Sequence, residues 1–305
     1  MTIEAVEKFE VGEEQTADHG VRFSYSRSEQ PLVHRTAIRL IERLSGQTRL
    51  EQIYRQWSRD PQAGENIFAA AVRMMRMGID TDEEKWSQVP KQGPVLFVAN
   101  HPFGVIDGLI IGHLATRIRP DTKILTHSLL CQPPEARDFM LPVDFGGTPE
   151  AQQTSLLTRR RTLDWLMTGH AVAVFPAGSV STSQSPLTGP ALDPQWHPFV
   201  GKLARLPGLT IVPVYFHGQN SRLFHIASHI HYVLRIALLF RETARRIGTK
   251  VKVSIGESIA SADLCAEAGR QNILRELRRR TLSLAGEGAP DPCLEFRGPD
   301  HVNPD

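Results

Sequence analysis

A histidine and an aspartate lie close together in the segment N-H-P-F-G-V-I-D, residues 100–107. An imidazole that donates one ring N–H to a carboxylate keeps a single tautomer, and its other nitrogen can then take a proton from a hydroxyl group. The pair is therefore a candidate for general-base catalysis, with His101 as the base and Asp107 as the residue that orients it. Spacing alone leaves a plainer interpretation open, in which His101 ends a turn and Asp107 caps a helix.

Two further segments follow apolar runs in the same way. They are F-P-A-G-S-V-S at residues 175–181 and V-P-V-Y-F-H-G at residues 212–218. The Pro and Gly of the first fix a turn whose backbone N–H groups could face a ligand oxygen. Taken by itself, each segment is typical of a loop that ends a strand.

These loops need a scaffold, and the sequence from about residue 90 predicts one in which short apolar runs alternate with helical stretches. The expected strands are Val95–Ala99, Lys123–Thr126, Leu141–Val143, Ala171–Phe175, Thr210–Tyr215 and Val251–Ile255. The expected helices are Ile106–Thr116, Glu150–Met167, Phe199–Arg205, Arg222–Ile247 and Arg270–Leu284. This alternation predicts an α/β fold with a mainly parallel central sheet flanked by helices. Ligands of such sheets bind outside the carboxyl ends of the strands, so all three segments should meet at one edge.

The rest of the sequence divides by composition. We expect a flexible acidic arm at residues 1–20, an N-terminal helical appendage at 21–84, the α/β domain at 85–285 and a disordered tail at 286–305. Within the appendage, apolar residues recur at helical spacing from Leu32 to about Met77.

Composition and charge exclude several classes of protein. The 305 residues are 41 % hydrophobic and 22 % charged with a net charge of +2, which is globular rather than disordered or fibrous. Cys131, Cys265 and Cys293 form no C-x-x-C pair, which argues against a disulfide framework or a zinc site.

No apolar run approaches the roughly 18 residues of a membrane-spanning helix, and the acidic start does not have the pattern of a signal peptide. Residues 221–252 carry seven Lys or Arg against one Glu, so one face can be basic although the total is nearly neutral.

The order of the three segments is more informative about function than any one segment alone. N-H-P-x-G-x-x-D, then F-P-A-G-x-x-S, then V-P-V-x-x-x-G, between about Pro94 and Gly256, resembles the lysophospholipid acyltransferase superfamily. The resemblance implies transfer of a fatty acyl group from a thioester to a lyso-lipid hydroxyl, with His101 as the general base and Asp107 orienting it. It also implies direct transfer without an acyl-enzyme, with oxyanion donors among the N–H groups of the Phe175–Ser179 turn or of the helix start after His101.

The sequence departs from familiar members of that superfamily in two ways. Five residues rather than four separate His101 from Asp107, and Gly104 can accommodate the extra one. Where phosphatidate-forming members show F-P-E-G-T-R-S, Ala177 replaces the Glu and Val180 replaces the Arg. Because Arg is the natural bidentate partner of phosphate, Val180 argues against a glycerol-phosphate acceptor.

The versions found here look like a bacterial branch that includes haemolysin-like proteins and the O-acyltransferases of aminolipid synthesis, as for ornithine lipids. The acceptor expected from that branch is an amino acid N-linked to a 3-hydroxy fatty acid. The substrate-contacting residues that the resemblance implies are Asn100, Phe103, Gly104, Phe175, Pro176, Ala177, Gly178, Ser179, Val180 and Ser181.

Cofactors and partners follow from the same resemblance. We expect no bound cofactor, no metal and no nucleic acid, and an acyl-ACP (acyl carrier protein) or acyl-CoA as the donor substrate. The expected location is cytoplasmic, peripheral on the inner face of the cytoplasmic membrane and in contact with its anionic surface. Arg159, Arg160 and Arg161 could dock an acidic carrier protein or form a solvated helix turn, and the helix at 222–247 could pack on the core or lie in a membrane surface.

Two other functions stay open at this point. One is acylation of lysophosphatidic acid to phosphatidic acid, within the same superfamily. The other is a non-catalytic module that binds lipid or acyl carrier protein, against which the retained Asn100, His101 and Asp107 argue.

Overall fold

The computed structural model describes residues 46–59, 61–127, 131, 133–143 and 149–298. Its main sheet has eight strands, seven of them in the order β1-β9-β8-β2-β5-β3-β4, with β10 paired to β8. The strands are β1 (Gly78–Asp80), β2 (Val95–Ala99), β3 (Lys123–His127), β4 (Met140–Val143), β5 (Ala171–Val174), β8 (Thr210–Phe216), β9 (Lys250–Ile255) and β10 (Ile259–Ala260). A separate hairpin pairs β6 (Thr182–Ser183) with β7 (Ala191–Leu192).

Most of the sheet is parallel. Strands β8, β2, β5, β3 and β4 run in one direction, whereas β9 and β10 pair antiparallel to β8. The expectation of a mainly parallel α/β sheet is thus confirmed, and each of the six strands expected from sequence is present.

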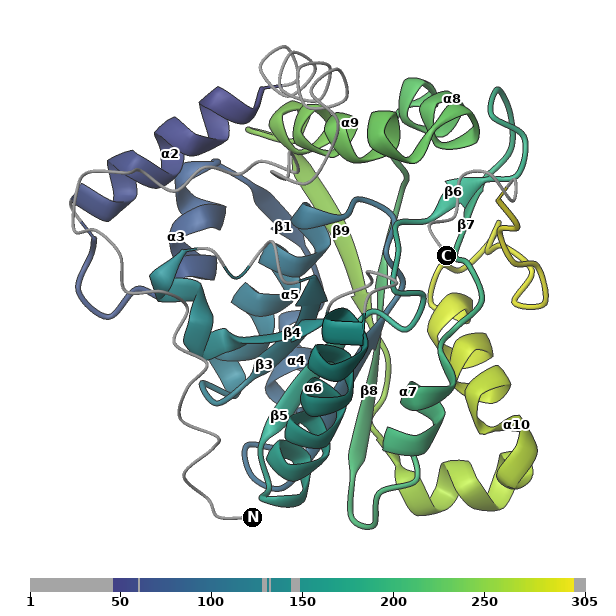
Figure 1. Cartoon of the computed structure of the whole chain (residues 1–305). Coiled ribbons are helices and arrows are strands. Elements are labelled where there is room, and N and C mark those ends of the chain that lie inside the picture. Colours follow the sequence, from purple (N-terminus) through teal and green to yellow (C-terminus); the bar gives the residue numbers. More distant parts are fainter. Residues whose placement is uncertain (1–45, 60, 128–130, 132, 144–148, 299–305) are drawn as a thin grey trace.

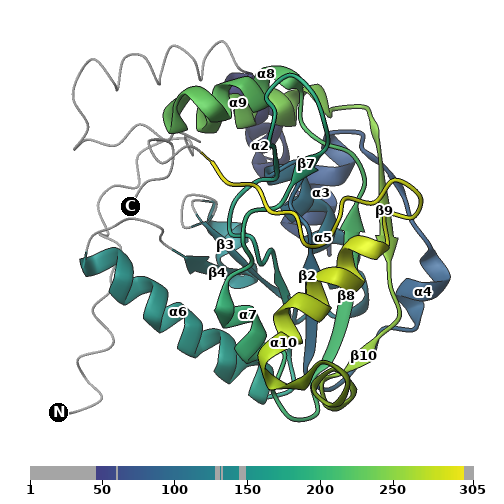
Figure 2. The same cartoon turned by 90° about the vertical axis from the view of Figure 1, so that its right-hand side faces the viewer.

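Helices cover both faces of the sheet (Figures 1 and 2). They are α2 (Gln47–Arg59), α3 (Ile67–Met74), α4 (Glu83–Ser87), α5 (Val105–Ile118), η3 (Pro134–Phe139), α6 (Pro149–Met167), α7 (Pro198–Leu203), α8 (Arg222–Ile230), α9 (Tyr232–Arg245) and α10 (Ser261–Ser283). The five residues of β2 are all buried and alternate between the faces. Phe97 points into a core with α3 and α5, and Leu96 points into a core with α6, α7 and α10.

The N-terminal helices share the core of the α/β domain. Phe68 of α3 is 1 % exposed and packs on α5, whose Gly112 leaves room for the ring. Strand β1 precedes residue 85, yet it pairs with β9 in the main sheet. The described residues from 67 to 84 therefore belong to the same folded body as the 85–285 domain, whereas the acidic arm at 1–20 lies outside the described residues.

Two expectations about the C-terminal third need correction. The single helix expected at 222–247 is two helices, because the backbone of His231 is extended between α8 and α9. The tail is ordered through residue 298 rather than disordered from 286, because Arg278 donates hydrogen bonds to the carbonyls of Pro292 and Leu294. Residues 299–305 of the expected tail lie outside the described residues.

The fit of Phe68 against α5 gives a stability prediction. A Cβ atom at Gly112 would lie 2.5 Å from the Phe68 ring, closer than atoms pack, so Gly112→Ala should lower the free energy of unfolding by about 1–3 kcal/mol. Gly108→Ala is the matched control in the same helix, since nothing lies within 4 Å of its Cβ. It should change stability little or raise it by about 0.5–1 kcal/mol. Urea unfolding of both variants tests the comparison, and equal effects would contradict it.

Candidate active site

The order of the strands brings the three sequence segments together. Strand β2 lies between β5 and β8, and all three are parallel. Their carboxyl ends therefore share one edge of the sheet, where His101 follows β2, Phe175 follows β5 and His217 follows β8. The meeting of the three loops at one edge agrees with the expectation from sequence.

A buried carboxylate organises the first of these loops. Asp107, in the first turn of α5, is fully buried, and its Oδ2 accepts the backbone N–H groups of Phe103 at 2.8 Å and Gly104 at 2.9 Å. The Nδ1 atom of His101 lies 3.0 Å from the same Oδ2, within ion-pair distance. Burial raises the pKa of Asp107, and the contacts with His101 and the two N–H groups oppose that rise only in part.

The imidazole of His101 is held in place but not sealed from solvent. Its side chain is 17 % exposed, and its ring stacks on Phe175 with 4.2 Å between centroids. The backbone carbonyl of His101 accepts the N–H of Ser181 at 2.8 Å. Segments 100–107 and 175–181 are thus joined through both the side chain and the backbone of His101.

The third segment holds the first from the opposite side. The Asn100 amide accepts the N–H of Phe216 at 2.7 Å and donates to the C=O of the same residue at 3.0 Å. Asn100 is 5 % exposed, so the structure gives it a strand-joining contact where the resemblance implies contact with substrate. Gly218 is required because a Cβ there would lie 2.9 Å from the buried ring of Phe103.

A cation lies over the ring of Phe103. The guanidinium of Arg246 lies 3.9 Å from the ring centroid and donates to the C=O of Gln219 at 2.9 Å. Burial lowers the pKa of Arg246, and the charge of Asp107 acts in the opposite direction. Phe103 is thereby fixed by both Arg246 and Gly218, and it is 1 % exposed.

Gly104, in the loop after β2, packs closely against Val180 of the second segment. Gly104 has a φ of +83°, which favours glycine, and a Cβ there would lie 3.1 Å from both Val180 and Leu239. Val180 is 6 % exposed and packs with Phe224 and Leu239 in an apolar cluster. The expected role of Gly104 in absorbing the extra loop residue agrees with this backbone conformation.

The turn at 175–179 contains the rest of the expected residues. Gly178 donates its N–H to the C=O of Phe175 at 3.0 Å, and the C=O of Pro176 accepts the N–H of His197 at 2.8 Å. Pro176 is buried, Ala177 is half-buried, and Gly178 and Ser179 are exposed. The N–H groups of Phe103 and Gly104, which directly precede helix α5, already bind Asp107, so these two groups are not available to bind an oxyanion.

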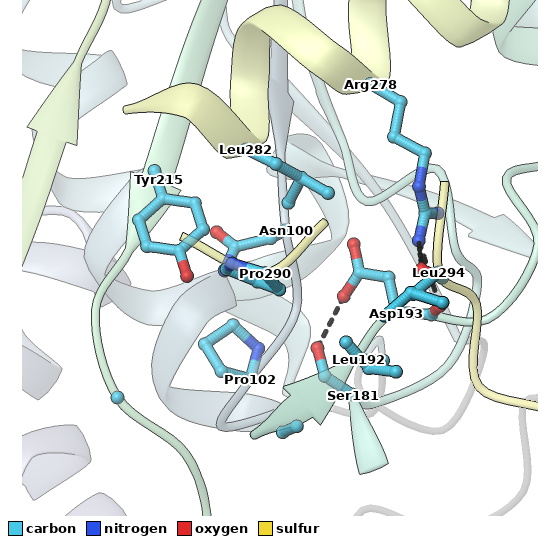
Figure 3. A pocket seen from close by; sticks show the side chains of 12 residues that line it. Asn100, Pro102, Ser181, Leu192, Asp193, Tyr215, Arg278, Leu282, Pro290 and Leu294 are labelled. Atoms are coloured by element: carbon cyan, nitrogen blue, oxygen red, sulfur yellow. Dashed lines mark hydrogen bonds between the residues drawn. The ribbon is translucent and has the colours of Figure 1, made fainter. Parts of the chain in front are cut away.

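Sequence reasoning missed several residues that support the site, chiefly Asp193, Arg246 and Arg278. Asp193 accepts the N–H of His101 although 92 positions separate them, and its carboxylate also accepts the indole N–H of Trp196. It accepts the hydroxyl of Ser181 as well (Figure 3). A charged residue in a loop carries no periodic signal, so composition and spacing do not reveal such a contact.

The other candidate groups have structural contacts. The Nδ1 atom of His225 accepts the N–H of Ser183 at 3.2 Å, and the Nε2 atom of His229 lies 2.9 Å from the C=O of Ser183. Within the ranges that the structure describes, no cluster of His, Cys, Asp or Glu could hold a metal ion. Arg159 lies over the Phe199 ring, with 5.7 Å from its guanidinium carbon to the centroid, whereas Arg160 and Arg161 are exposed.

The geometry defines what this site can do. With the Nδ1–H of His101 facing Asp107, Nε2 is the ring nitrogen left to accept a proton at the partly exposed edge of the ring. A hydroxyl group that approaches this edge can be deprotonated as it attacks an electrophilic carbonyl.

Two curated relatives carry the same printed name, "Lyso-glycine lipid O-acyltransferase". One, from Phocaeicola vulgatus, is 27 % identical over 150 residues, which are 48 % of this chain and 50 % of the relative. The other, from Bacteroides thetaiotaomicron, is 28 % identical over 150 residues, or 48 % of this chain and 52 % of the relative. The chain thus matches about half the length of each of these relatives.

Among solved structures, the crystal structure of the 1-acyl-sn-glycerophosphate (LPA) acyltransferase PlsC from Thermotoga maritima matches 84 % of this chain and 83 % of its own. The TM-score is 0.43 at 15 % identity, a similarity too low to carry an argument. A family model described as "Acyltransferase" matches residues 29–287, which is most of the sequence and includes every loop of the site. The chain therefore belongs to this acyltransferase family.

Proposed function

We propose that this protein moves a fatty acyl group from an acyl thioester to the 3-hydroxyl of a lyso-aminolipid, an N-acyl amino acid lipid. The observation that carries the proposal is the pairing of His101 with the buried Asp107 at the carboxyl end of β2. The name printed for two relatives makes a glycine headgroup the first candidate, ahead of the ornithine headgroup that the resemblance first suggested.

In the proposed reaction, Nε2 of His101 takes the proton of the acceptor hydroxyl as the oxygen attacks the thioester carbonyl. A bond forms between that oxygen and the acyl carbon, and the carbonyl oxygen becomes an oxyanion. Collapse of the tetrahedral intermediate breaks the carbon–sulfur bond, and the departing thiolate takes the proton from the imidazolium. Asp107 stays ionised throughout and stabilises the positive imidazolium.

Backbone donors would stabilise the oxyanion, and the 175–179 turn is our proposed source. The ring of Phe175 lies against His101, so this turn borders the reacting edge of the imidazole. Gly178 already donates within the turn, which favours Ala177 and Ser179 as donors. An oxyanion donor of this kind is worth about 3–4 kcal/mol in the transition state.

The surroundings of Val180 favour an aminolipid acceptor over a glycerol-phosphate one. Its side chain faces the apolar cluster with Phe224 and Leu239, so it offers no charge to a phosphate. The nearby guanidinium of Arg235, 6 % exposed, bonds to the C=O of Val180 and, at 2.8 Å, to the hydroxyl of Thr182. That cation serves to hold the loop in place.

The donor and the location of the enzyme belong to the proposal as well. We propose peripheral contact with an anionic membrane through α8, which exposes Leu223 by 47 % and Ile230 by 56 %. The exposed Arg160 and Arg161 of α6 offer positive charge to an acyl carrier protein, and coenzyme A is the alternative thioester. In the described part of the protein, no helix is long and apolar enough to cross a bilayer.

The acceptor is tested directly with purified protein. We expect N-(3-hydroxypalmitoyl)glycine and palmitoyl-ACP or palmitoyl-CoA to yield a diacylated product, detected by mass spectrometry. His101→Ala should lower the rate by about 10³-fold, because general-base catalysis supplies factors of that order. His170→Ala is the matched control, since that ring stacks on Trp165 outside the three loops of the site.

Other outcomes would redirect the proposal. The ornithine analogue as the better acceptor would change the headgroup but keep the reaction. Preference for 1-acylglycerol 3-phosphate would replace the proposal with phosphatidate formation. Tight lipid binding without turnover by any donor would indicate a non-catalytic binding module.

Asp107→Asn should separate activity from stability. The amide oxygen can still accept the N–H groups of Phe103 and Gly104, but the charge that stabilises the imidazolium is lost, so kcat should fall by about 10³-fold or more. Burial raises the pKa of Asp107, so its ionised form costs folding free energy as pH rises past about 3.9, the value of an unfolded Asp. The variant should therefore match or exceed the wild type in Tm at pH 7, with a smaller difference at pH 4. A large loss of Tm at pH 7 would contradict this account.

A further inference from the structure

We propose that Asp193 is a positioning residue, which holds the backbone of the catalytic base through a hydrogen bond to the N–H of His101. This inference rests on the proposed function for its kinetic consequences, whereas the contacts themselves do not depend on the substrate. Asp193 lies after the short strand β7, outside the three segments recognised from sequence.

The carboxylate of Asp193 accepts three hydrogen bonds. Oδ1 accepts the hydroxyl of Ser181 and, at 3.4 Å, the N–H of His101, whereas Oδ2 accepts the indole N–H of Trp196 at 3.0 Å. Asp193 is 4 % exposed. A buried charge is costly unless such donors compensate it, so these contacts fix the carboxylate firmly in one orientation.

The same atoms close a ring between two loops. Ser181 donates its hydroxyl to Asp193 and its N–H to the C=O of His101, while the N–H of His101 points back to Asp193. Both backbone polar groups of His101 are thereby tied to one rigid unit. Because catalysis requires near-ideal alignment, a shift of about 1 Å in the base can cost about 100-fold in rate.

A second layer encloses Asp193 from the C-terminal side. The guanidinium of Arg278 on α10 donates to the backbone carbonyls of Asp193 and three residues of neighbouring loops, Pro194, Pro292 and Leu294. Figure 3 shows Asp193 between Ser181 and Arg278. Arg278 is 4 % exposed, so a buried positive charge accompanies the buried carboxylate.

The cavity beside this cluster is too small to be a substrate site. Its volume is about 20 Å³, and its lining includes Asn100, Ser181, Asp193, Tyr215 and Arg278. A space of that size holds one water molecule and neither an acyl group nor a headgroup. Asp193 therefore does not contact the substrate but acts indirectly, through its hydrogen bonds to His101 and Ser181.

Two double variants isolate the acceptor oxygen of residue 193. Trp196→Phe removes the indole N–H, which would otherwise face the NH2 group of an asparagine at position 193. In this background, Asp193→Asn keeps an oxygen that can accept from His101 and Ser181. Asp193→Ala in the same background keeps no such oxygen. We expect kcat of the asparagine double variant to stay within about 10-fold of that of Trp196→Phe. The kcat of the alanine double variant should fall about 100-fold below the same reference. The KM for the acceptor should stay within about 2-fold of the reference in both.

Amide hydrogen exchange gives a readout that needs no substrate. The backbone amide hydrogen of His101 should exchange with solvent faster in the alanine double variant than in the asparagine double variant. Equal kcat and equal exchange in the two would overturn the proposal. If wild-type protein acylates none of the probes, the proposed function fails, and the exchange comparison still decides the role of Asp193.

Ser181→Ala covers the case in which the alanine double variant does not fold. It removes only the hydroxyl that shares Oδ1 with His101, so it should lower kcat by about 3- to 10-fold at unchanged KM and speed exchange of the His101 amide. No change in either quantity would overturn the proposal.

Discussion

The site depends on how a charged carboxylate is kept inside an apolar sheet edge. Asp107 sits against the core with no exposed surface, and His101, two backbone N–H groups and the charge of Arg246 compensate it. For both N–H groups to point at one oxygen, the loop must fold back over the helix start, which sets the left-handed conformation of Gly104. The residues that pack around this loop then act mainly to keep it folded back.

That constraint explains why distant segments make such specific contacts. Phe103 contributes one of the two N–H groups, and its ring lies between Arg246 and the space that Gly218 leaves open. Asn100 ties the loop to the end of β8 through both of its amide atoms. Each of these contacts limits the freedom of the loop, so the cost of burying Asp107 is shared by the whole edge of the sheet.

Sequence alone predicted the strands, the sheet type and the meeting of three loops, because these follow from apolar periodicity and from the rule that parallel strands share their carboxyl edge. It did not predict Asp193, which accepts the N–H of His101 from 92 positions away, or Arg278, whose partners are backbone carbonyls, because neither set of contacts leaves a spacing pattern. It also misread the tail, since Gly, Pro and Asp there are typical of disorder unless a buried group such as Arg278 binds their carbonyls. His231 has no sequence signal of a helix break, because apolar periodicity continues across it.

The support from α10 and the residues after it has a consequence for how the protein is made. Synthesis runs from the N-terminus, so His101 and Asp107 leave the ribosome long before Arg278 and the loop that accepts its hydrogen bonds at Pro292 and Leu294. Strands β2, β5 and β8 can form during translation while the carboxylate of Asp193 still lacks the layer that encloses it. His101 would then reach its final position only after the ribosome has synthesised the segment through Leu294, so the last part of the site to become rigid depends on the last described part of the chain.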